Sequence, residues 1–354
     1  MKSYPLLVHY RYVNILVCAL GLSVIVSCAG PGKKKSEEVS PDSTSTLAER
    51  PLRKVLIYPY WVTTAQFAGY YVGNVKGIYR KYGIDVEIIP YNPQKKLSEL
   101  MYSGKPCFAL LWLSNAIRQK SGGLDIVDIA QLSTRSSLML LAKKTSGIKT
   151  IQDMDGKKAG IWAGYEMQPK ALFKKFNVNV EIIPIGSTNN LFLNDGVEIT
   201  NASWYDEYHS ILNSGYNKEE LETFFFWEYD LNFLEDGIYA LQYTVDKYPG
   251  LCHYFVQATL ESWLYAFDHP EESIAIVLQL QRDAEIPASR AHQQWMLDRF
   301  RDLLLQPGRV INTELPEKQY QQVAKILLDA GLIRKIPAYG TFHVRYETLK
   351  NPEL

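Results

Sequence analysis

Two segments of this chain match each other in residue type, and this repeat limits the folds that the chain can adopt. Tyr79–Pro90 reads YRKYGIDVEIIP and Phe173–Pro184 reads FKKFNVNVEIIP, so the aromatic, basic and VEIIP positions coincide. A chance similarity between two strand-forming segments is the alternative. The agreement runs over twelve positions, which favours a shared architecture.

Each copy follows a hydrophobic run that predicts a buried strand, at Lys54–Tyr60 and at Lys158–Trp162. After the first run, apolar residues recur near every 3.6 positions, which predicts a helix over Ala65–Tyr82 that stops at Gly83. A strand over Val86–Ile89 completes the unit. We therefore predict a βαβ unit with parallel strands in each half of the chain, and hence two α/β lobes.

The amino end carries the pattern of an export signal. Lys2 and Arg11 precede an apolar run, Ile15–Val26, that is within the range of a signal peptide and shorter than the ~20 residues that span a bilayer. The run ends in Ile25–Cys28, which resembles a bacterial lipobox. An ordinary signal peptide with an incidental cysteine is the alternative.

The lipobox interpretation predicts cleavage before Cys28 and lipidation of that residue. Residues 1–27 are then a lipoprotein signal peptide, and residues 28–51, which are rich in Ser, Pro, Lys and Glu, are a flexible tether. We expect an exported protein that is held at the cell envelope by a lipid anchor.

Composition excludes several classes of protein. Lys and Arg total 38, and Asp and Glu also total 38. A nucleic-acid-binding protein would show a basic excess, so no nucleic-acid partner is expected. Four cysteines in 354 residues exclude a disulfide scaffold.

Four of the seven tryptophans follow predicted strands. Trp61 and Trp112 do so in the first lobe, and Trp162 and Trp204 do so in the second. In open α/β sheets, ligands bind at the carboxyl ends of the strands. These side chains are therefore expected to face a cleft between the lobes, although capping of the core is the commoner fate of a single Trp.

The same segments resemble a known family, the thiamine-pyrimidine-precursor family, which contains solute-binding lipoproteins of ABC importers and a eukaryotic pyrimidine synthase. The resemblance covers nearly all of the chain after Leu52. Its motifs are Trp61–Gly73, Lys76–Tyr79, Tyr82–Ile88, Ile151–Trp162, Tyr205–Tyr208, Leu234–Ala240 and Tyr248–Trp263. Asp206 stands where the family usually has Asn.

The resemblance implies a bilobed periplasmic-binding-protein type II fold, with two open α/β lobes joined by two crossover segments. We expect the crossings near Ser137–Lys143 and Gly237–Thr244. Lobe one would then comprise residues 52–141 and 242–354, and lobe two residues 142–241. The resemblance implies that the protein is the solute-binding component of an ABC importer. We expect a monomer that binds permease subunits and needs no cofactor or metal.

The charges in the predicted cleft limit the class of ligand that the site would bind. Acids gather in or near the strand exits, at Glu166, Asp206, Glu207, Glu228 and Asp230, and Arg135 is the only clear base there. This favours a ligand that donates hydrogen bonds or carries positive charge. A flat aminopyrimidine fits, because it can stack on Trp or Tyr and pair its amino group and protonatable ring nitrogen with the Glu207 carboxylate. Riboflavin or a cationic amine remains an alternative cargo.

The sequence thus predicts a set of ligand-binding residues and no catalytic residue. The set is Trp61, Gln66, Phe67, Trp112, Trp162, Tyr165, Glu166, Trp204, Tyr205 and Glu207. A pyrimidine synthase is the less favoured reading, because Gln66 stands where the synthase branch has His. The cysteines left after cleavage of the signal peptide, Cys28, Cys107 and Cys252, are also widely spaced. The six His show no metal-ligand spacing.

Overall fold

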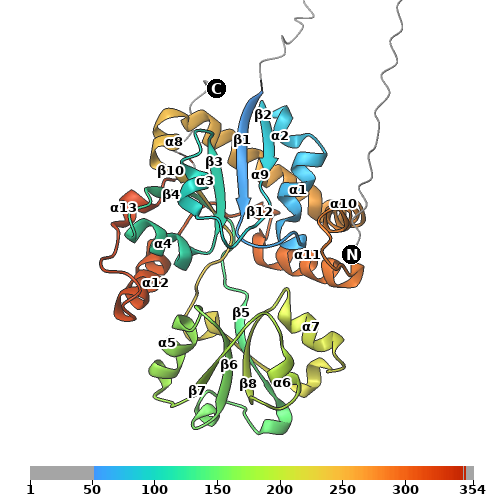
Figure 1. Ribbon diagram of the computed structural model, residues 1–354, viewed down its shortest axis with the longest axis vertical. Coiled ribbons are helices and arrows are strands. Elements are labelled where there is room, and N and C mark those ends of the chain that lie inside the picture. Colours follow the sequence, from blue (N-terminus) through green and yellow to red (C-terminus); the bar gives the residue numbers. More distant parts are fainter. Residues whose placement is uncertain (1–51, 346, 348–354) are drawn as a thin grey trace, which may run out of the picture. The chain divides into compact units, whose positions relative to one another are not determined.

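Two five-stranded sheets organise the computed structural model, which describes residues 52–345 and 347 (Figure 1). The expected signal peptide, tether and lipidated Cys28 lie outside the described residues. Within the described part of the chain, no helix is long and apolar enough to cross a membrane. Both sheets belong to a single compact unit.

The sheet of lobe one has the order β2-β1-β3-β10-β4. Its strands are β1 (Arg53–Pro59), β2 (Ile84–Ile88), β3 (Cys107–Leu111), β4 (Ile126–Gln131) and β10 (Gly237–Leu241). Strand β1 is parallel to β2 and β3, whereas β10 is antiparallel to β3 and β4. The central strands are continuous apolar runs because both faces of the sheet are covered by helices.

Lobe two repeats this arrangement in the order β7-β6-β8-β5-β9. Its strands are β5 (Leu138–Lys143), β6 (Lys158–Trp162), β7 (Glu181–Ile185), β8 (Ile199–Ser203) and β9 (Leu221–Phe225). Strands β6 and β7 are parallel, as β1 and β2 are, and the antiparallel β5 occupies the place of β10. The shared architecture predicted from the repeat is confirmed.

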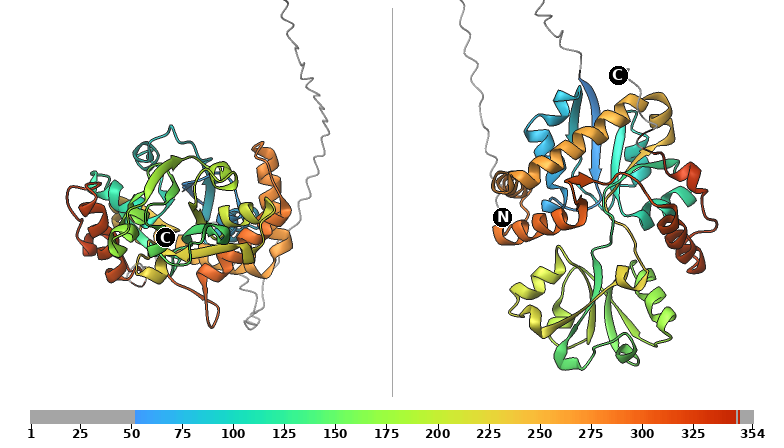
Figure 2. Two further views of the ribbon diagram at one scale, coloured as in Figure 1. Left: turned by 90° about the horizontal axis from the view of Figure 1, so that it is seen from below. Right: turned by 180° about the vertical axis from the view of Figure 1, so that it is seen from behind.

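Most helices belong to lobe one, and the long α9 crosses its sheet (Figure 2). Lobe one holds α1 (Ala68–Val75), α2 (Ile78–Lys81), α3 (Leu97–Met101), α4 (Leu113–Ser121), α8 (Gln242–Lys247), α9 (Pro249–Asp268), α10 (Pro270–Asp283), α11 (Arg290–Leu304), α12 (Glu317–Asp329) and α13 (Tyr339–Phe342), with a hairpin of β11 (Leu305–Gln306) and β12 (Val310–Ile311). Lobe two holds α5 (Met167–Phe176), α6 (Asn190–Leu193) and α7 (Glu207–Asn213).

The single helix predicted over Ala65–Tyr82 is wrong in detail. The segment is a 3-10 turn over Ala65–Phe67, then α1, then α2. The break falls at Gly77, whose φ of 70° is left-handed and cannot continue a right-handed helix. Gly83, with a φ of 76°, ends the segment as predicted.

The lobe boundaries differ from those expected near residues 141 and 241. All of β5 pairs within the lobe-two sheet, so the first crossing is residues 132–137 and not Ser137–Lys143. All of β10 pairs within the lobe-one sheet, so the second crossing is residues 230–236 and not Gly237–Thr244. The apolar sequence of these strands is the same in either lobe, and only their pairing settles where they belong.

The two crossing segments are bonded to each other through a buried carboxyl group. Glu235 accepts hydrogen bonds from the Ser136 hydroxyl at 2.6 Å and from the Ser137 N–H at 2.9 Å. The Asn232 side-chain oxygen accepts another hydrogen bond between the two segments, from the Ser136 N–H, at 2.7 Å. Burial raises the pKa of Glu235 to about 8. The two connections therefore form one joint rather than two independent tethers.

Helix α11 of lobe one also contacts lobe two directly, beside β8 and α7. We call this contact the α11 clasp; it consists of Trp204, Asp206 and His209 of lobe two and His292, Trp295 and Arg299 of α11. The Trp295 indole N–H donates to the Trp204 carbonyl at 3.0 Å, and its ring stacks on His209 at 4.8 Å. Arg299 lies 4.8 Å from the centre of the Trp204 ring, a favourable cation–π distance.

A chain of three polar side chains completes the clasp. His292 Nε2 lies 2.9 Å from Asp206 Oδ1, and His292 Nδ1 lies 2.8 Å from His209 Nδ1. On the opposite flank, α12 of lobe one meets α5 of lobe two, and Gln322 donates to the Asp230 carbonyl. The lobes are thus in contact on both sides of the joint.

We predict that Trp295→Ala favours separation of the lobes. The substitution removes one interlobe hydrogen bond, worth about 1 kcal/mol, and a stacked aromatic pair, worth about 0.5–1.5 kcal/mol. Because 1.4 kcal/mol is a factor of ten, the ratio of open to closed protein should rise about tenfold or more. Small-angle scattering of the ligand-free protein should show a larger radius of gyration.

Trp227→Ala is the matched control, because it removes an indole of lobe two that does not contact α11. An unchanged radius of gyration for folded Trp295→Ala would show that the clasp does not hold the lobes together.

Candidate functional site

A cavity of about 330 Å³ lies where the strand ends of the two lobes face each other. Lobe one and the second crossing supply Tyr60, Trp61, Gln66, Phe67, Tyr91, Leu110, Trp112 and Asp236; lobe two supplies Trp162, Ala163, Tyr165, Ile185, Gly186, Ser187, Ser203, Tyr205, Asp206 and Glu207. This volume is within the range of small-ligand sites.

The loop after β1 is fixed in place by two buried glutamines. Gln293 of α11 accepts a hydrogen bond from the Ala65 N–H at 2.7 Å, and Gln281 of α10 donates to the Thr63 carbonyl at 2.9 Å. The loop presents Trp61, of which 42% is exposed, to the cavity. Its large exposed ring is the kind of surface that a stacked ligand would cover.

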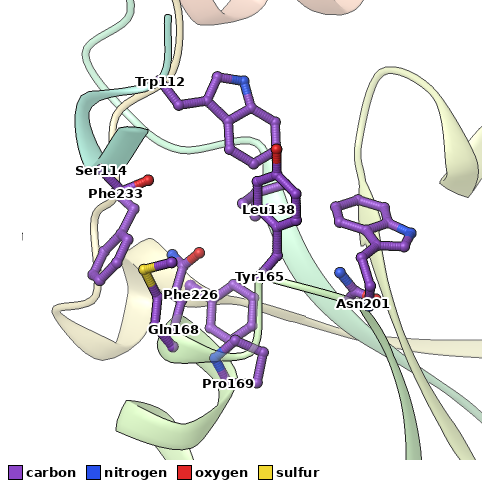
Figure 3. Close-up of a pocket in the computed structure, with 11 residues that line it drawn as sticks. Trp112, Ser114, Leu138, Tyr165, Gln168, Pro169, Asn201, Phe226 and Phe233 are labelled. Carbon is purple, nitrogen blue, oxygen red and sulfur yellow. Dashed lines mark hydrogen bonds between the residues drawn. The ribbon is translucent and has the colours of Figure 1, made fainter. Parts of the chain in front are cut away.

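Three aromatic rings from both lobes stand together in this region. Tyr165 lies 5.2 Å from Trp112 and 6.3 Å from Trp162, both in edge-to-face geometry. In Figure 3, Trp112 lies above Tyr165. Both residues line a small void of about 20 Å³, together with Gln168 and Asn201. Asn201 accepts a hydrogen bond from the Trp162 N–H at 3.1 Å, which fixes the end of β6. The aromatic wall is therefore rigid and spans both lobes.

Glu207 is the first residue of α7 and its carboxyl group lines the cavity. Its Oε2 accepts hydrogen bonds from the Ser203 hydroxyl at 2.6 Å and from the Ser203 N–H at 3.0 Å. Burial, together with the neighbouring Asp206 charge, raises the pKa of Glu207 to about 7, against the opposing effect of the Ser203 bonds. The group can therefore offer either a carboxylate or a carboxylic acid near neutral pH.

Asp236, at the end of the second crossing, is the other deeply placed acid. The Gln66 amide donates to its Oδ1 at 3.3 Å, whereas its buried Oδ2 has no hydrogen-bond partner among the described residues. Only 8% of the residue is exposed. Burial raises its pKa to about 7.

The cavity wall carries no compensating base. Among the described residues that line it, none is Lys, Arg or His. Arg135, the base expected in the cleft, instead lies over the rings of Trp204 and Trp227, at 5.7 and 5.5 Å from their centres. Asp206 reaches the nearest imidazole, that of His292, through the clasp.

The structure brings eight of the ten predicted site residues to the cavity: Trp61, Gln66, Phe67, Trp112, Trp162, Tyr165, Tyr205 and Glu207. Trp204 lies outside this lining: it follows β8 as expected but turns into the α11 clasp between two arginines. Glu166 also lies outside the lining, and its Oε1 accepts a hydrogen bond from the Gly164 N–H at 2.9 Å and so closes the turn before α5.

Sequence reasoning missed Tyr60, Tyr91, Ser203 and Asp236. Tyr60 ends the first predicted strand and directly precedes Trp61, so the strand-exit rule could have included it. Asp236 gave no such signal, because it precedes β10, the antiparallel strand of lobe one. Antiparallel β10 begins at the edge where its neighbour β3 ends, which places Asp236 beside the strand exits.

The described part of the chain holds neither a metal-binding cluster nor a disulfide. No group of three or more His, Cys, Asp and Glu side chains there is placed to hold a metal ion. Cys107 and Cys252 are both buried free thiols. Burial raises the pKa of each thiol to about 12, so neither is a reactive thiolate at neutral pH.

Comparison with known sequences identifies relatives of similar length. The chain is 24% identical over 320 residues to a putative thiamine biosynthesis protein of Haemophilus influenzae, covering 85% of this chain and 95% of that protein. It is 21% identical over 290 residues to riboflavin-binding protein RibY of Chloroflexus aurantiacus, covering 77% and 80%.

Comparison with solved structures shows the fold. The aliphatic sulphonate binding protein SsuA of Escherichia coli matches with a TM-score of 0.65 and 15% identity, over 82% of this chain and 91% of that one. A desulfurization enzyme, DSZB, matches with a TM-score of 0.56 and 11% identity, over 84% and 99%. The periplasmic-binding-protein-like fold is confirmed, and it carries both binding proteins and an enzyme.

A family model described as "NMT1/THI5 like" matches residues 64–273, which hold helices α1 and α2, all of lobe two and both crossings. These residues supply most of the cavity wall. The chain therefore belongs to the NMT1/THI5-like family.

Proposed function

We propose that this protein is the substrate-binding component of an ABC importer and that it captures a flat heteroaromatic ligand, with a pyrimidine precursor of thiamine as the first candidate. The observation that carries the proposal is the cavity itself, which combines aromatic rings from both lobes with buried acids and no lining base. The relatives named for thiamine biosynthesis and for riboflavin binding support a heteroaromatic cargo.

The aromatic rings supply the affinity for a flat ring. A stacked aromatic pair adds about 0.5–1.5 kcal/mol beyond the area that it buries. A hydrogen bond to a charged group nets about 1.5–3 kcal/mol. Two or three such contacts, with apolar burial, reach the ~8 kcal/mol of micromolar binding.

Glu207 supplies the recognition of the ring edge. A carboxylate pairs with an aminopyrimidine whose ring nitrogen is protonated, because it accepts two parallel hydrogen bonds, one from the amino group and one from the adjacent ring N–H. The bonds from Ser203 hold Oε2 in place and so orient the group. We assign Glu207 as the principal polar contact and Trp61 or Trp162 as the stacking face.

Riboflavin is the second candidate, because the cavity has room to extend. Tyr60 and Tyr91 also line a neighbouring groove of about 310 Å³. A ligand with a long arm could place its rings in the cavity and its arm along this groove. An anion such as a sulfonate is less well matched, because such a ligand is normally held by Arg, Lys or helix N-terminal amides.

We predict that Glu207→Gln weakens binding of a hydroxymethyl- or aminomethyl-pyrimidine by about one to two decades. Glutamine keeps the shape and an acceptor for Ser203, but it removes the charge and places an amide donor against the protonated ring nitrogen, which is itself a donor. The lost charge-assisted bond costs about 1.5–3 kcal/mol. Isothermal titration calorimetry, with thiamine, riboflavin and an alkanesulfonate as comparison ligands, measures the change.

Glu166→Gln is the matched control, since this acid is close in sequence to the aromatic wall but outside the cavity lining. If no pyrimidine binds the wild type, the cargo is wrong. If one binds and Glu207→Gln leaves its affinity unchanged, the assignment of Glu207 fails.

We also propose that the protein is anchored to a membrane through lipidated Cys28, on the strength of the Ile25–Cys28 pattern. Cys28→Ser should release the protein from the membrane fraction of a bacterial host, and wild type should incorporate labelled lipid. Wild type that already fractionates as soluble protein without label would contradict the anchor.

A further inference from the structure

Four carboxyl groups interact electrostatically with the phenol of Tyr205, a buried residue of the cavity wall. They belong to Asp206, Glu207, Glu235 and Asp236, and all of them raise the pKa of Tyr205 beyond the effect of its burial. Negative charge at this density is unfavourable in a buried site unless a cation or a proton balances it.

Three of these four groups have partners in the protein. Glu235 is bonded to Ser136 and Ser137, Glu207 to Ser203, and Asp206 to His292. Asp236 differs, because Gln66 satisfies only its Oδ1. Asp236 lines the cavity, and its Oδ2 is buried without a hydrogen-bond partner among the described residues. A buried oxygen left without a partner normally costs stability.

Among the described residues that line the cavity beside Asp236, none carries a positive charge. The titratable groups that interact with it are Tyr70 of α1, Tyr205 after β8 and Tyr239 of β10, together with the neighbouring Glu235. Burial raises the pKa of each tyrosine well above 10, so all three phenols are neutral. The described wall of the cavity therefore supplies no cation for Asp236.

We propose that the ligand supplies it: the cargo is a flat heteroaromatic compound that carries an ammonium group, and Asp236 is the counterion of that group. This inference rests on the proposed function and names the class of ligand within it. The ring edge faces Glu207 on lobe two, while the ammonium group meets Asp236 at the joint between the lobes. One ligand thereby bonds to lobe two and to the crossing segment at once.

The backbone at Asp236 makes a clean test possible. Its φ of 58° lies in the left-handed region, which Asn tolerates better than other residues with a side chain. Asp236→Asn therefore removes the charge without straining the chain, and Asn can still accept the bond from Gln66. Asp230→Asn is the matched control, because Asp230 also has a left-handed φ of 54° and its side chain is exposed beside Lys175.

The experiment compares two ligands that share one ring, 4-amino-2-methylpyrimidine with either a hydroxymethyl or an aminomethyl group at carbon 5. Calorimetry at pH 7.5 should show that wild type binds the aminomethyl compound about tenfold or more tightly than the hydroxymethyl compound, as expected for a buried charge-assisted bond. Asp236→Asn should lose most of this preference, and Asp230→Asn should keep it.

The dependence on pH adds a second readout. Because the pKa of Asp236 is raised to about 7, the carboxylate forms mainly above that pH, while a primary ammonium group stays protonated. Wild-type affinity for the aminomethyl compound should therefore rise between pH 6 and pH 7.5, and the rise should be smaller in Asp236→Asn. Glu207, His209 and His292 are present in both proteins, so the difference between them belongs to Asp236.

Stability separates a binding role from a structural one. An acid with a raised pKa takes up a proton on folding, so it lowers the stability of the folded state as pH rises toward that pKa. Ligand-free Asp236→Asn should thus melt at a higher temperature than wild type at pH 7.5, although it binds the ammonium ligand less well. A purely structural aspartate would show the opposite, a lower melting temperature.

Each outcome decides between the proposals. If neither pyrimidine binds, the proposed function fails and this inference fails with it. If the hydroxymethyl compound binds as tightly as the aminomethyl compound to wild type, the function stands and the ammonium ligand is wrong. If the aminomethyl preference persists in Asp236→Asn, the cation is real but Asp236 is not its counterion.

Discussion

The two crossings between the lobes, and the antiparallel strand that follows each of them, determine where the other strands of this fold lie. The chain leaves lobe one before β5, builds lobe two, and returns as β10, so each sheet contains an antiparallel strand that directly borders a crossing. The parallel strands of both sheets then end toward the same gap. Because the joint is cross-bonded through Glu235, the strand ends that carry Trp112 and Trp162 are held facing each other.

The aromatic rings of the site stabilise it without a ligand, whereas its buried acids favour the binding of one. The aromatic rings of Trp112, Tyr165 and Trp162 pack on one another and hold their shape without a ligand. Asp236 and Glu207 are instead held in surroundings that penalise their charged forms. A ligand that donates hydrogen bonds relieves that penalty, so part of the binding energy is stored in the ligand-free protein.

The sequence was sufficient to predict the repeated architecture and the tryptophans of the cavity wall, because strand exits follow directly from apolar runs. The prediction failed where contacts between segments far apart in the chain determine whether a residue faces the cavity. Trp204 obeys the same strand-exit rule as Trp162, yet α11, more than eighty residues later in the chain, draws it into the clasp. Asp236 stands at the start of a strand, and only the antiparallel pairing of β10 brings it to the cavity.

The central claim is that the cavity between the lobes holds a flat, positively charged heteroaromatic compound. Native mass spectrometry of protein purified from its own host, without added ligand, tests this claim most directly. The account predicts a bound small molecule that, once released, absorbs as a heteroaromatic ring and carries a basic amine. A bound sulfonate, or another anion without an aromatic ring, would contradict it.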